Sequence, residues 1–383
     1  MVDMKICEVS QYYAPYTGGQ EAYVRGLSRT IAKRGHRVSV VTTSKPDNES
    51  HDLGVEIAWH SAALRPMNNP ISFAAIRETE LLESSDVIHV HNEHSFLSLS
   101  VAALRERFSA PLVLTVHGQL KFGSLLYDTI RSVYSKSAGN LILRKADCVF
   151  VNSHEDGLDV LRRGVPRERV IEVSNAIDTN YLSQFEHSRA PTETIQRLGL
   201  EDNAKVILFV GRLIPRKGIR TLLEAFERYF LLDRDVVLVV VGDGPLAPIL
   251  RSASARATSR KAIIWKPWIE PSLLYSLYQA ATVFVLPSLA EVCPTALLEA
   301  LFFGCQCIAT DIPGVRDHFR GMVTLVPPND SQTLAGELRR LVEDREDTGF
   351  TREEVRKTLA QRYNWESVAD AYLSTFAKLV AVG

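Results

Sequence analysis

The stretch KVILFVGRLIPRKGIRTLLEAF, Lys205 to Phe226, decides the fold class of this chain. Its short β-branched and apolar run predicts a buried strand, and the apolar residues at its end recur at helical spacing. A buried strand that leads directly into such a helix is the building unit of a parallel sheet. The loop between them gathers Arg212, Arg216, Lys217 and Arg220 near a helix N-terminus, which is itself partly positive, so we expect the loop to face an anion.

The same alternation of strand and helix patterns extends over most of the chain and predicts an α/β fold with two doubly wound, Rossmann-like domains. A polar, weakly periodic segment from about Ala176 to Leu200 is interpreted as the linker. The predicted strands are KICEVS, RVSVVTT, VEIAWH, DVIHVH, PLVLTVHG, DCVFVNS and RVIEVSN in the first domain, and KVILFVG, DVVLVVVG, AIIWKPW, ATVFVLPS, QCIATD and MVTLVPP in the second.

Length and charge limit the class of protein. At 383 residues and 42.7 kDa the chain is about twice the usual size of one domain, in keeping with two cores. Its 44 basic and 45 acidic side chains nearly cancel, so no overall field favours nucleic acid, and we expect recognition to be local. Five cysteines without a CxxC pair, no secretory leader pattern and no apolar run of about 18 residues predict a cytoplasmic protein.

Ligands of doubly wound sheets bind beyond the carboxyl ends of the strands, so residues just after each apolar run are site candidates. After KICEVS, Gly18 and Gly19 would let backbone N–H groups approach a phosphate or sugar, although an ordinary glycine turn is an equal alternative. After PLVLTV, His117 is either reactive or a structural hydrogen-bonding residue.

A metal site is a second hypothesis for the segment DVIHVHNEH. His89 and His91 lie on one face of a predicted strand, and with Glu93 and His94 they could supply ligands. Nothing else in the sequence supplies hard-ligand spacing, so no metal is expected.

The basic loop after KVILFVG favours a diphosphate as its anion, with a solvated basic turn as the alternative. Gly211 and Gly218 bracket the charges. Arg212 would offer a fork to phosphate oxygens and Lys217 a point charge, and both could stabilise a departing nucleotide.

Two carboxylates follow the strand ATVFVLPS. Glu291 is expected in the loop before a helix, and Glu299 lies about a turn and a half into it with its side chain directed back toward the N-terminus. Both could therefore reach one ligand and accept hydrogen bonds from sugar and ribose hydroxyls. For Glu299 alone, a charge on the helix surface is the alternative.

Two motifs match other sites formally. VVVGDGPLA, Val239 to Ala247, fits the dinucleotide fingerprint GxGxxA, but no acidic residue between Pro248 and Ile269 could bind a ribose hydroxyl, so a nicotinamide cofactor is not expected. Asp233-Arg234-Asp235 fits a DxD metal-nucleotide motif, but it precedes its strand and is more simply a helix-to-strand turn.

Four segments together resemble the retaining glycosyltransferases of family 4: YAPYTGGQEAYVRGLSRTIAKRGHRVSVVTT, GRLIPRKG, VGDGP and LPSLAEVCPTALLEALFFG. The similarity covers nearly the whole chain in the family's order. It implies the GT-B architecture, two Rossmann-like domains facing across a cleft, with NWESVADAYL, Asn364 to Leu373, in a helix that crosses back to the first domain. The acceptor-side domain would be residues 1–185 with the crossing helix 364–383, and the nucleotide-sugar donor domain residues 186–363.

The resemblance assigns catalysis to four residues. Arg212 and Lys217 would hold the donor diphosphate and stabilise its charge as it leaves. Glu291 would bind hydroxyls of the donor sugar, and His117 would lie beside the anomeric centre. The implied reaction transfers a sugar to a hydroxyl acceptor with retention, the leaving phosphate taking the acceptor proton on the same face. No metal and no cofactor are expected, since the nucleotide sugar is a co-substrate.

Further residues would bind the donor by the same resemblance. Glu299 would bind the ribose, Gly18 and Gly19 would give backbone contacts near phosphate, and the nucleobase would lie near Trp268 and Ile269. The other donor-binding candidates are Val292, Cys293, Pro294 and Thr295.

Three positions depart from the family pattern. Pro267 replaces the usual glycine before the nucleobase residues, and Val292 replaces a small residue, which would reshape the sugar pocket. In SNAID, Ala176 replaces a glycine, so a strained left-handed alanine is expected.

The sequence leaves the substrates open. UDP and GDP sugars are both candidate donors, and the acceptor is a sugar, lipid-linked or small-molecule hydroxyl in polysaccharide, glycolipid or glycoconjugate synthesis. The basic segment Phe122 to Ala146 is interpreted as a partly buried helix with a solvated face, with peripheral contact to the inner face of a membrane as the alternative. A catalytically silent nucleotide-sugar binding protein and a non-hydrolysing sugar-nucleotide epimerase are the alternative functions.

Overall fold

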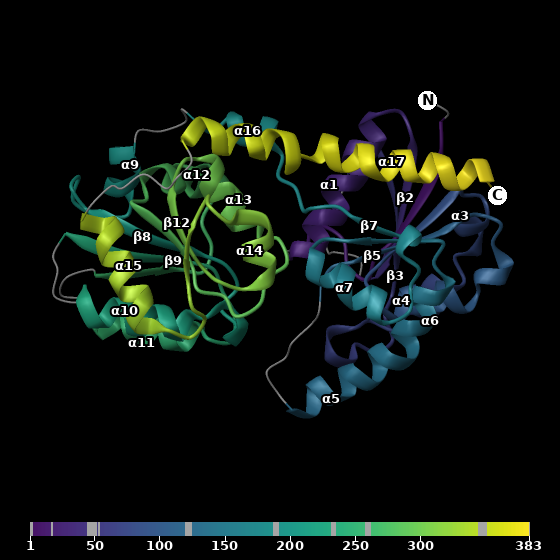
Figure 1. The fold of residues 1–383 in the computed structure, drawn as a ribbon, viewed down its shortest axis with the longest axis horizontal. Helices are drawn as coiled ribbons and strands as arrows, with labels where there is room; N and C mark the ends of the chain where they lie inside the picture. The colour runs from purple at the N-terminus through teal and green to yellow at the C-terminus, as the bar shows by residue number, and fades with distance from the viewer. Residues whose placement is uncertain are drawn as a thin grey trace. The chain divides into compact units, whose positions relative to one another are not determined.

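The computed structural model describes residues 3–16, 18–43, 52, 54–118, 125–186, 191–230, 235–256, 262–343 and 351–382. The chain divides into two compact units, unit 1 (Met1–Ala176 with Arg362–Gly383) and unit 2 (Ile177–Gln361). Each contains one parallel sheet flanked by helices (Figure 1).

Unit 1 has a seven-stranded sheet of order β3-β2-β1-β4-β5-β6-β7. Its strands are β1 (Lys5–Val9), β2 (Arg37–Thr43), β3 (Val55–His60), β4 (Val87–His91), β5 (Leu112–Val116), β6 (Cys148–Val151) and β7 (Val170–Glu172). Its helices are α1 (Gly19–Lys33), α2 (Phe73–Ile76), α3 (Thr79–Glu83), α4 (Phe96–Ala103), α5 (Leu125–Tyr134), α6 (Asn140–Lys145), α7 (His154–Arg162) and α17 (Trp365–Val382), with a π-helical turn at Ser135–Gly139.

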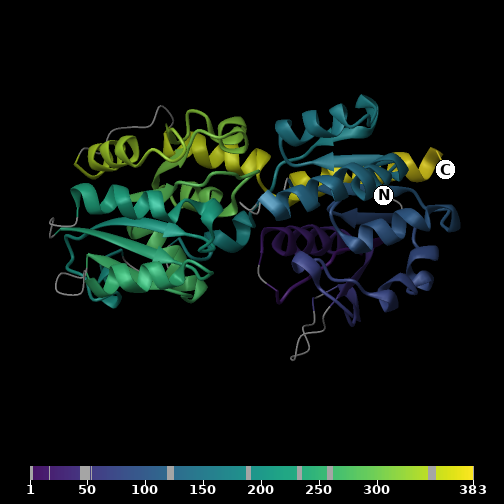
Figure 2. The ribbon, with the colours of Figure 1, turned by 90° about the horizontal axis from the view of Figure 1, so that it is seen from below.

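The strands of unit 1 send alternate side chains to two separate cores. On one face, strand residues such as Ile6, Val87 and Val113 pack against α1 and α17. On the other, their sequence neighbours pack against α4, α6 and α7. Figure 2 shows α17, in yellow, lying along unit 1. At the contact between α1 and α17, Gly26 leaves the space that the indole of Trp365 fills.

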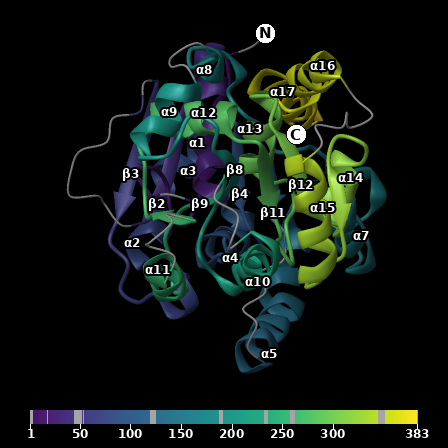
Figure 3. The same ribbon diagram turned by 90° about the vertical axis from the view of Figure 1, so that its left-hand side faces the viewer.

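Unit 2 has a six-stranded parallel sheet of order β10-β9-β8-β11-β12-β13. Figure 3 shows α9, α12 and α13 on one face of this sheet and α10 and α11 on the other. The strands are β8 (Lys205–Val210), β9 (Val236–Val241), β10 (Ile263–Lys266), β11 (Val283–Leu286), β12 (Gln306–Thr310) and β13 (Thr324–Val326). The helices are α8 (Thr179–Ser183), α9 (Pro191–Arg197), α10 (Ile219–Tyr229), α11 (Ala247–Arg256), α12 (Pro271–Ala280), α13 (Thr295–Phe302), α14 (Pro313–Phe319), α15 (Ser331–Glu343) and α16 (Arg352–Arg362).

The predicted fold class is confirmed, and each predicted strand segment contains one strand of the two sheets. The linker prediction is wrong in part, because the segment from Ala176 to Leu200 contains α8 and α9. The boundary of unit 1 lies after Ala176 rather than after residue 185 because this segment packs on α12. The Phe185 ring lies 4.9 Å from that of Tyr275, and Gln279 donates a hydrogen bond to the Phe185 carbonyl over 2.9 Å.

Two other features of the chain bear on the predictions. Ala176 is not among the described residues with positive φ, so the expected strained alanine is wrong; it is a buried residue whose N–H bonds the Asn175 side chain. Within the described ranges, no helix combines the length and hydropathy needed to cross a bilayer.

Candidate functional site

The order of strands in unit 2 reverses between β8 and β11, which pair directly. The loops after these strands therefore meet at the carboxyl edge of the sheet, where ligands of doubly wound folds bind. The backbone N–H of Leu289 donates to the Arg216 carbonyl over 2.8 Å, and the Arg216 guanidinium donates to the Ala290 carbonyl over 2.9 Å. One cation of the basic loop thus joins the two loops.

Gly218 makes this close approach possible. It has φ 67° and caps the start of α10, a conformation that favours glycine. A Cβ at this position would overlap the carbonyl oxygen of Pro287 in the loop after β11. The backbone of the basic loop can therefore pack on the other loop only with glycine here.

Lys217 and Glu291 form an ion pair across the two loops. Lys217 Nζ lies 2.5 Å from Glu291 Oε1, and their side chains are only 15% and 7% exposed. Burial would raise the pKa of the Glu291 carboxyl, but Lys217 and Arg216 outweigh it and hold the pKa below its ordinary value. Glu291 is therefore ionised and is itself part of the anionic partner that the basic loop was expected to face.

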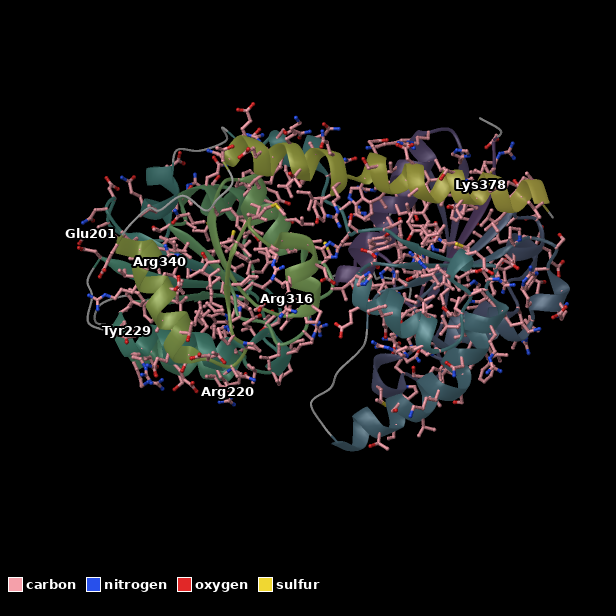
Figure 4. All side chains as sticks on the ribbon, in the orientation of Figure 1. Glu201, Arg220, Tyr229, Arg316, Arg340 and Lys378 are labelled. Carbon is pink, nitrogen blue, oxygen red and sulfur yellow. The ribbon has the colours of Figure 1, made fainter. Side chains whose placement is uncertain are left out.

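The other two cations of the loop are exposed. The Arg212 guanidinium has no ion pair or side-chain hydrogen bond to any residue that the structure describes. Arg220, labelled in Figure 4, is exposed in the first turn of α10. The edge of unit 2 thus combines a paired lysine, an ionised carboxylate and an arginine that no described side chain neutralises.

Glu299 lies in a different environment from Glu291. It is on α13, half-buried, and accepts a hydrogen bond from the Tyr278 hydroxyl of α12 over 3.1 Å. Burial raises the pKa of its carboxyl to about 7, only partly opposed by that hydrogen bond. The structure gives no contact between Glu299 and Glu291 among the described residues, so their predicted convergence on one ligand stays a prediction.

The remaining donor-binding candidates of unit 2 lie in loops or at the start of α13. Trp268 is 73% exposed in the loop after β10, next to the partly buried Ile269. The segment after Glu291 leads directly into α13: Val292 is partly buried, Cys293 is a buried free thiol, Pro294 caps the helix and Thr295 begins it.

The glycines of VGDGP shape the basic loop. A Cβ on Gly242 would overlap the Gly211 carbonyl oxygen, and one on Gly244 would lie 2.6 Å from the Leu213 carbonyl oxygen. The Leu213 N–H in turn donates to the Asp243 carbonyl over 2.8 Å. This motif therefore supports the loop after β8. Of the DxD motif, Asp233 and Arg234 lie outside the described residues.

In unit 1, Gly18 precedes α1 and Gly19 begins it. A Cβ on Gly18 would overlap the Glu21 carboxylate, so a negative side chain lies over this glycine. An anionic ligand approaching the same backbone would have to displace Glu21.

His117 follows β5 and belongs to a buried polar network that the sequence reasoning did not find. His117 Nε2 lies 3.0 Å from His91 Nδ1, and His91 Nε2 lies 2.6 Å from Glu8 Oε2. His89 Nδ1 is 2.8 Å from the same Glu8 oxygen. The Glu8, His89 and His91 side chains are all fully buried.

The predicted four-residue grouping for a metal site is wrong. His89 and His91 face Glu8, whereas Glu93 and His94 form a separate pair at 3.2 Å, with Arg163 3.5 Å from Glu93. The reason is strand alternation: residues 89 and 91 lie on the face covered by α1 and α17, and Glu93 lies beyond the end of the strand. The same alternation, applied to Glu8 and to the neighbouring β1 and β4, could have found the network, since Glu8 and His89 are register partners.

The basic segment before β6 is not one continuous helix. It contains α5, the π-helical turn and α6, in which Ile142 and Leu143 are buried. Lys136 and Arg144 are exposed, and Lys145 Nζ lies 2.5 Å from Glu106 Oε1. Phe122 to Ser124 and the side chains of Asp128 and Arg131 lie outside the described set.

Comparison with solved structures identifies the fold. Sucrose-phosphate synthase from Thermosynechococcus elongatus matches with a TM-score of 0.77 at 22% identity, covering 99% of both chains. Anabaena HepE in complex with UDP matches with a TM-score of 0.78 at 20% identity, covering 98% of this chain and 100% of that one. The two Rossmann-like units are those of the GT-B fold.

Sequence comparison agrees over almost the same length. D-inositol 3-phosphate glycosyltransferase of Acidothermus cellulolyticus is 27% identical over 397 aligned positions, which span 95% of this chain and 86% of that protein. The family model for Glycosyltransferase Family 4 matches residues 17–181, and the model for Glycosyl transferases group 1 matches residues 191–362. The chain belongs to the family 4 glycosyltransferases of group 1 and is a transferase of the glycosyl type.

Proposed function

We propose that this glycosyltransferase moves a sugar from a nucleotide-diphosphate donor to a hydroxyl acceptor with retention of configuration. The observation that carries the proposal is the pairing of Lys217 with the ionised Glu291 at the strand-order reversal of unit 2, beside Arg212, which no described side chain neutralises. Support comes from the solved structures of Anabaena HepE, which were determined with UDP and with UDP-glucose.

The chemistry of the loops suits such a donor. Arg212 would bind a diphosphate in a bidentate way and Lys217 would bind it as a point charge. Glu291 would then accept hydrogen bonds from sugar hydroxyls. In the reaction, the bond from the anomeric carbon to the phosphate oxygen breaks and a bond to the acceptor oxygen forms on the same face. The acceptor proton passes to the leaving phosphate, whose charge the two cations stabilise.

The proposal gives His117 of unit 1 a contact with the donor sugar, and it leaves the acceptor as a sugar, lipid-linked or small-molecule hydroxyl. It requires no metal. Transfer that stops with EDTA and returns with manganese would contradict this part. Sedimentation with anionic liposomes, lost when Lys136 and Arg144 are replaced by Ser, would favour an acceptor in a membrane.

The first test is a thermal-shift panel of UDP, GDP, ADP and their sugar conjugates on the wild type and Arg212→Ala. A ligand at 100 times its dissociation constant should stabilise the native protein by roughly 2.7 kcal/mol. We expect one nucleotide series to stabilise the wild type more than the variant. Stabilisation by none of them would remove the main support for the proposal.

The second test follows the product by NMR with the donor that the panel identifies. A retained anomeric configuration is expected, with a loss of about a hundredfold or more in turnover for Arg212→Ala. Interconversion of the donor without an acceptor would indicate an epimerase, and binding without turnover over a broad acceptor panel would indicate a silent binding protein.

A further inference from the structure

A chain of polar side chains crosses the face of the unit 1 sheet that α1 and α17 cover. Glu8 on β1 and His89 on β4 are register partners, as are His91 on β4 and Thr115 on β5. Glu8, His89, His91 and Thr115 are all fully buried in an otherwise apolar core. Burying polar groups costs folding free energy unless they are hydrogen-bonded. The hydrogen bonds of this network are therefore part of what allows these side chains to be buried in the core.

His117 stands at the end of this chain. Its Nε2 meets His91 Nδ1 at 3.0 Å, and the two rings stack with an interplanar angle of 24°. The Tyr23 ring also packs against the imidazole of His117, at a centroid distance of 5.0 Å and an interplanar angle of 75°. Among the described residues, Nδ1 of His117 has no hydrogen-bond partner. The ring is thus fixed in orientation, and the described residues leave its second nitrogen without a hydrogen-bond partner.

The Glu8 carboxylate determines where the protons lie. Burial alone would raise its pKa, but the charge of His89 and the bonding to both imidazoles lower that pKa to about 2. An ionised carboxylate only accepts hydrogen bonds, so the His91 nitrogen that faces it, Nε2 at 2.6 Å, must carry a hydrogen.

The remaining assignments follow along the chain. Burial and the neighbouring His89, against the attraction of Glu8, lower the pKa of His91 to about 4, so its ring is neutral and Nδ1 is bare. A bare Nδ1 must accept the hydrogen of His117 Nε2. Burial and the two other imidazoles lower the pKa of His117 well below its ordinary value, so this ring is also neutral and its own Nδ1 is bare.

We infer that Glu8 and His91 are positioning residues that fix His117 as its Nε2–H tautomer. In this tautomer Nδ1 accepts a hydrogen bond from a hydroxyl of the donor sugar. This assignment rests on the proposed function and specifies the contact. A bare nitrogen repels ionised phosphate oxygens, which also only accept hydrogen bonds. The partner of His117 is therefore a sugar hydroxyl and not the diphosphate.

The distances argue for hydrogen bonding over metal ligation by Glu8, His89 and His91, whose ligand atoms lie within 4.8 Å of one another. Both imidazole nitrogens approach the same carboxylate oxygen at 2.6 and 2.8 Å. Ligands of a tetrahedral zinc, each about 2.0–2.1 Å from the metal, would stand roughly 3.3 Å apart.

The direct test needs no substrate. Long-range ¹H–¹⁵N correlation spectra of ¹⁵N-histidine-labelled protein distinguish bare from protonated ring nitrogens, and His117→Ala assigns the signals. We expect wild-type His117 with a protonated Nε2 and a bare Nδ1 at pH 7.5. A proton on Nδ1 would overturn the inference, whether or not the enzyme transfers sugar and whether or not Glu8→Gln folds.

Variants then test the dependence on Glu8. Glu8→Gln offers amide hydrogens to His91, which lets the tautomers of both rings reverse. Tyr372→Phe is the matched control, because it removes a buried hydroxyl that lies 2.8 Å from Thr115 Oγ1 and 3.0 Å from the Tyr23 hydroxyl but, within the described part of the chain, forms no hydrogen bond with His91 or His117. We expect the His117 signals to change in Glu8→Gln and to stay in Tyr372→Phe. Unchanged His117 signals in folded Glu8→Gln would contradict the role of Glu8.

Kinetics separate positioning from a general structural role. With the donor that binds wild-type protein, Glu8→Gln should lower kcat/KM by about tenfold to a hundredfold, as expected for a misplaced hydrogen bond. In the His117→Ala background the same change should cost less than about threefold, since it acts through His117. Equal losses in both backgrounds would refute the coupling. An inactive wild type with the expected tautomer would refute the proposed function alone.

Discussion

Replacing Lys217 by Met tests the electrostatics of the candidate donor site. The substitution keeps the length of the side chain and removes the ammonium that lies 2.5 Å from the Glu291 carboxylate. Glu291 is only 7% exposed, so water cannot replace the lost partner fully. The variant therefore keeps a buried carboxylate that loses its nearest cation and is stabilised by Arg216 and the Ser288 side chain.

The magnitude follows from the geometry of the pair. At an effective dielectric constant of about 20, opposite charges this close attract by roughly 7 kcal/mol, most of which offsets their dehydration. Removing one partner of a buried pair costs about 3 to 5 kcal/mol, and the exposure of Lys217 favours the lower value. For a domain of this size, about 3 kcal/mol lowers the melting temperature by roughly 6 to 12 °C.

The pH dependence gives the effect a distinctive sign. In the wild type the folded pKa of Glu291 is lowered, so the stability from the pair is present above the unfolded pKa and is lost as pH falls through the folded value. In Lys217→Met the largest opposing charge is gone, so burial raises the pKa of Glu291 relative to the wild type. The loss of stability of Lys217→Met relative to the wild type should therefore be large at pH 8 and small near pH 5.

Scanning calorimetry of wild type, Lys217→Met, Glu291→Gln and the double variant measures both effects. We expect Lys217→Met alone to be the least stable at pH 8 and the double variant to recover most of the loss. Arg316→Met is the matched control, since Arg316, labelled in Figure 4, forms an exposed pair with Asp311 at 2.6 Å. Its shift should be less than about 2 °C. Additive single effects, or a Lys217→Met shift that does not change with pH, would refute the reasoning.

Three further changes have defined outcomes. Gly218→Ala should abolish nucleotide-induced thermal shifts, because its Cβ would overlap the Pro287 carbonyl, whereas Gly336→Ala, in open space on α15, should stabilise by about 0.5–1 kcal/mol. Burial is the main cause that raises the pKa of Asp156 to about 7, so ionisation of this carboxyl destabilises the fold as pH rises. Asp156→Asn should therefore increase the free energy of unfolding, measured by chemical denaturation, by roughly 2 to 4 kcal/mol at pH 8 and by little at pH 4. If Glu299 binds ribose as a carboxylate, the affinity for the nucleotide, measured by titration calorimetry, should fall as pH drops through about 7. In Glu299→Gln the affinity should change with pH only as far as the nucleotide itself titrates.

The sequence predicts the sheets well because their signal is local. Runs such as VVLVVV in β9 are buried on both faces. A continuous apolar run of this kind predicts a strand of a parallel sheet even when the neighbouring strands are not known. The basic loop after β8 can also be predicted from the sequence, because its charged residues and glycines are close together in the chain. The pairing of Lys217 with Glu291 is different: it joins residues 74 apart, and no local pattern contains it.

The buried network shows where local reading ends. Glu8 stands in the apolar run KICEVS, where a single acid gives no motif, and it acquires partners only through the register of β1 with β4. His117 could be named from its place after β5, but its tautomer depends on residues 26 and 109 positions away. The prediction for Ala176 is wrong for a different reason. A glycine at this position of the family suggests a left-handed backbone, but Ala176 does not have a positive φ.

VGDGP shows that one spacing can arise from different physical needs. In a dinucleotide fingerprint, glycines let a pyrophosphate approach the backbone. Here Gly242 and Gly244 let the carbonyls of Gly211 and Leu213 approach, so the missing Cβ atoms serve the neighbouring loop of the same chain. Since that loop presents Arg212 and Lys217, any bulk added at these glycines should weaken anion binding without touching a charge. A glycine motif therefore identifies a ligand only after the structure shows what occupies the space it leaves.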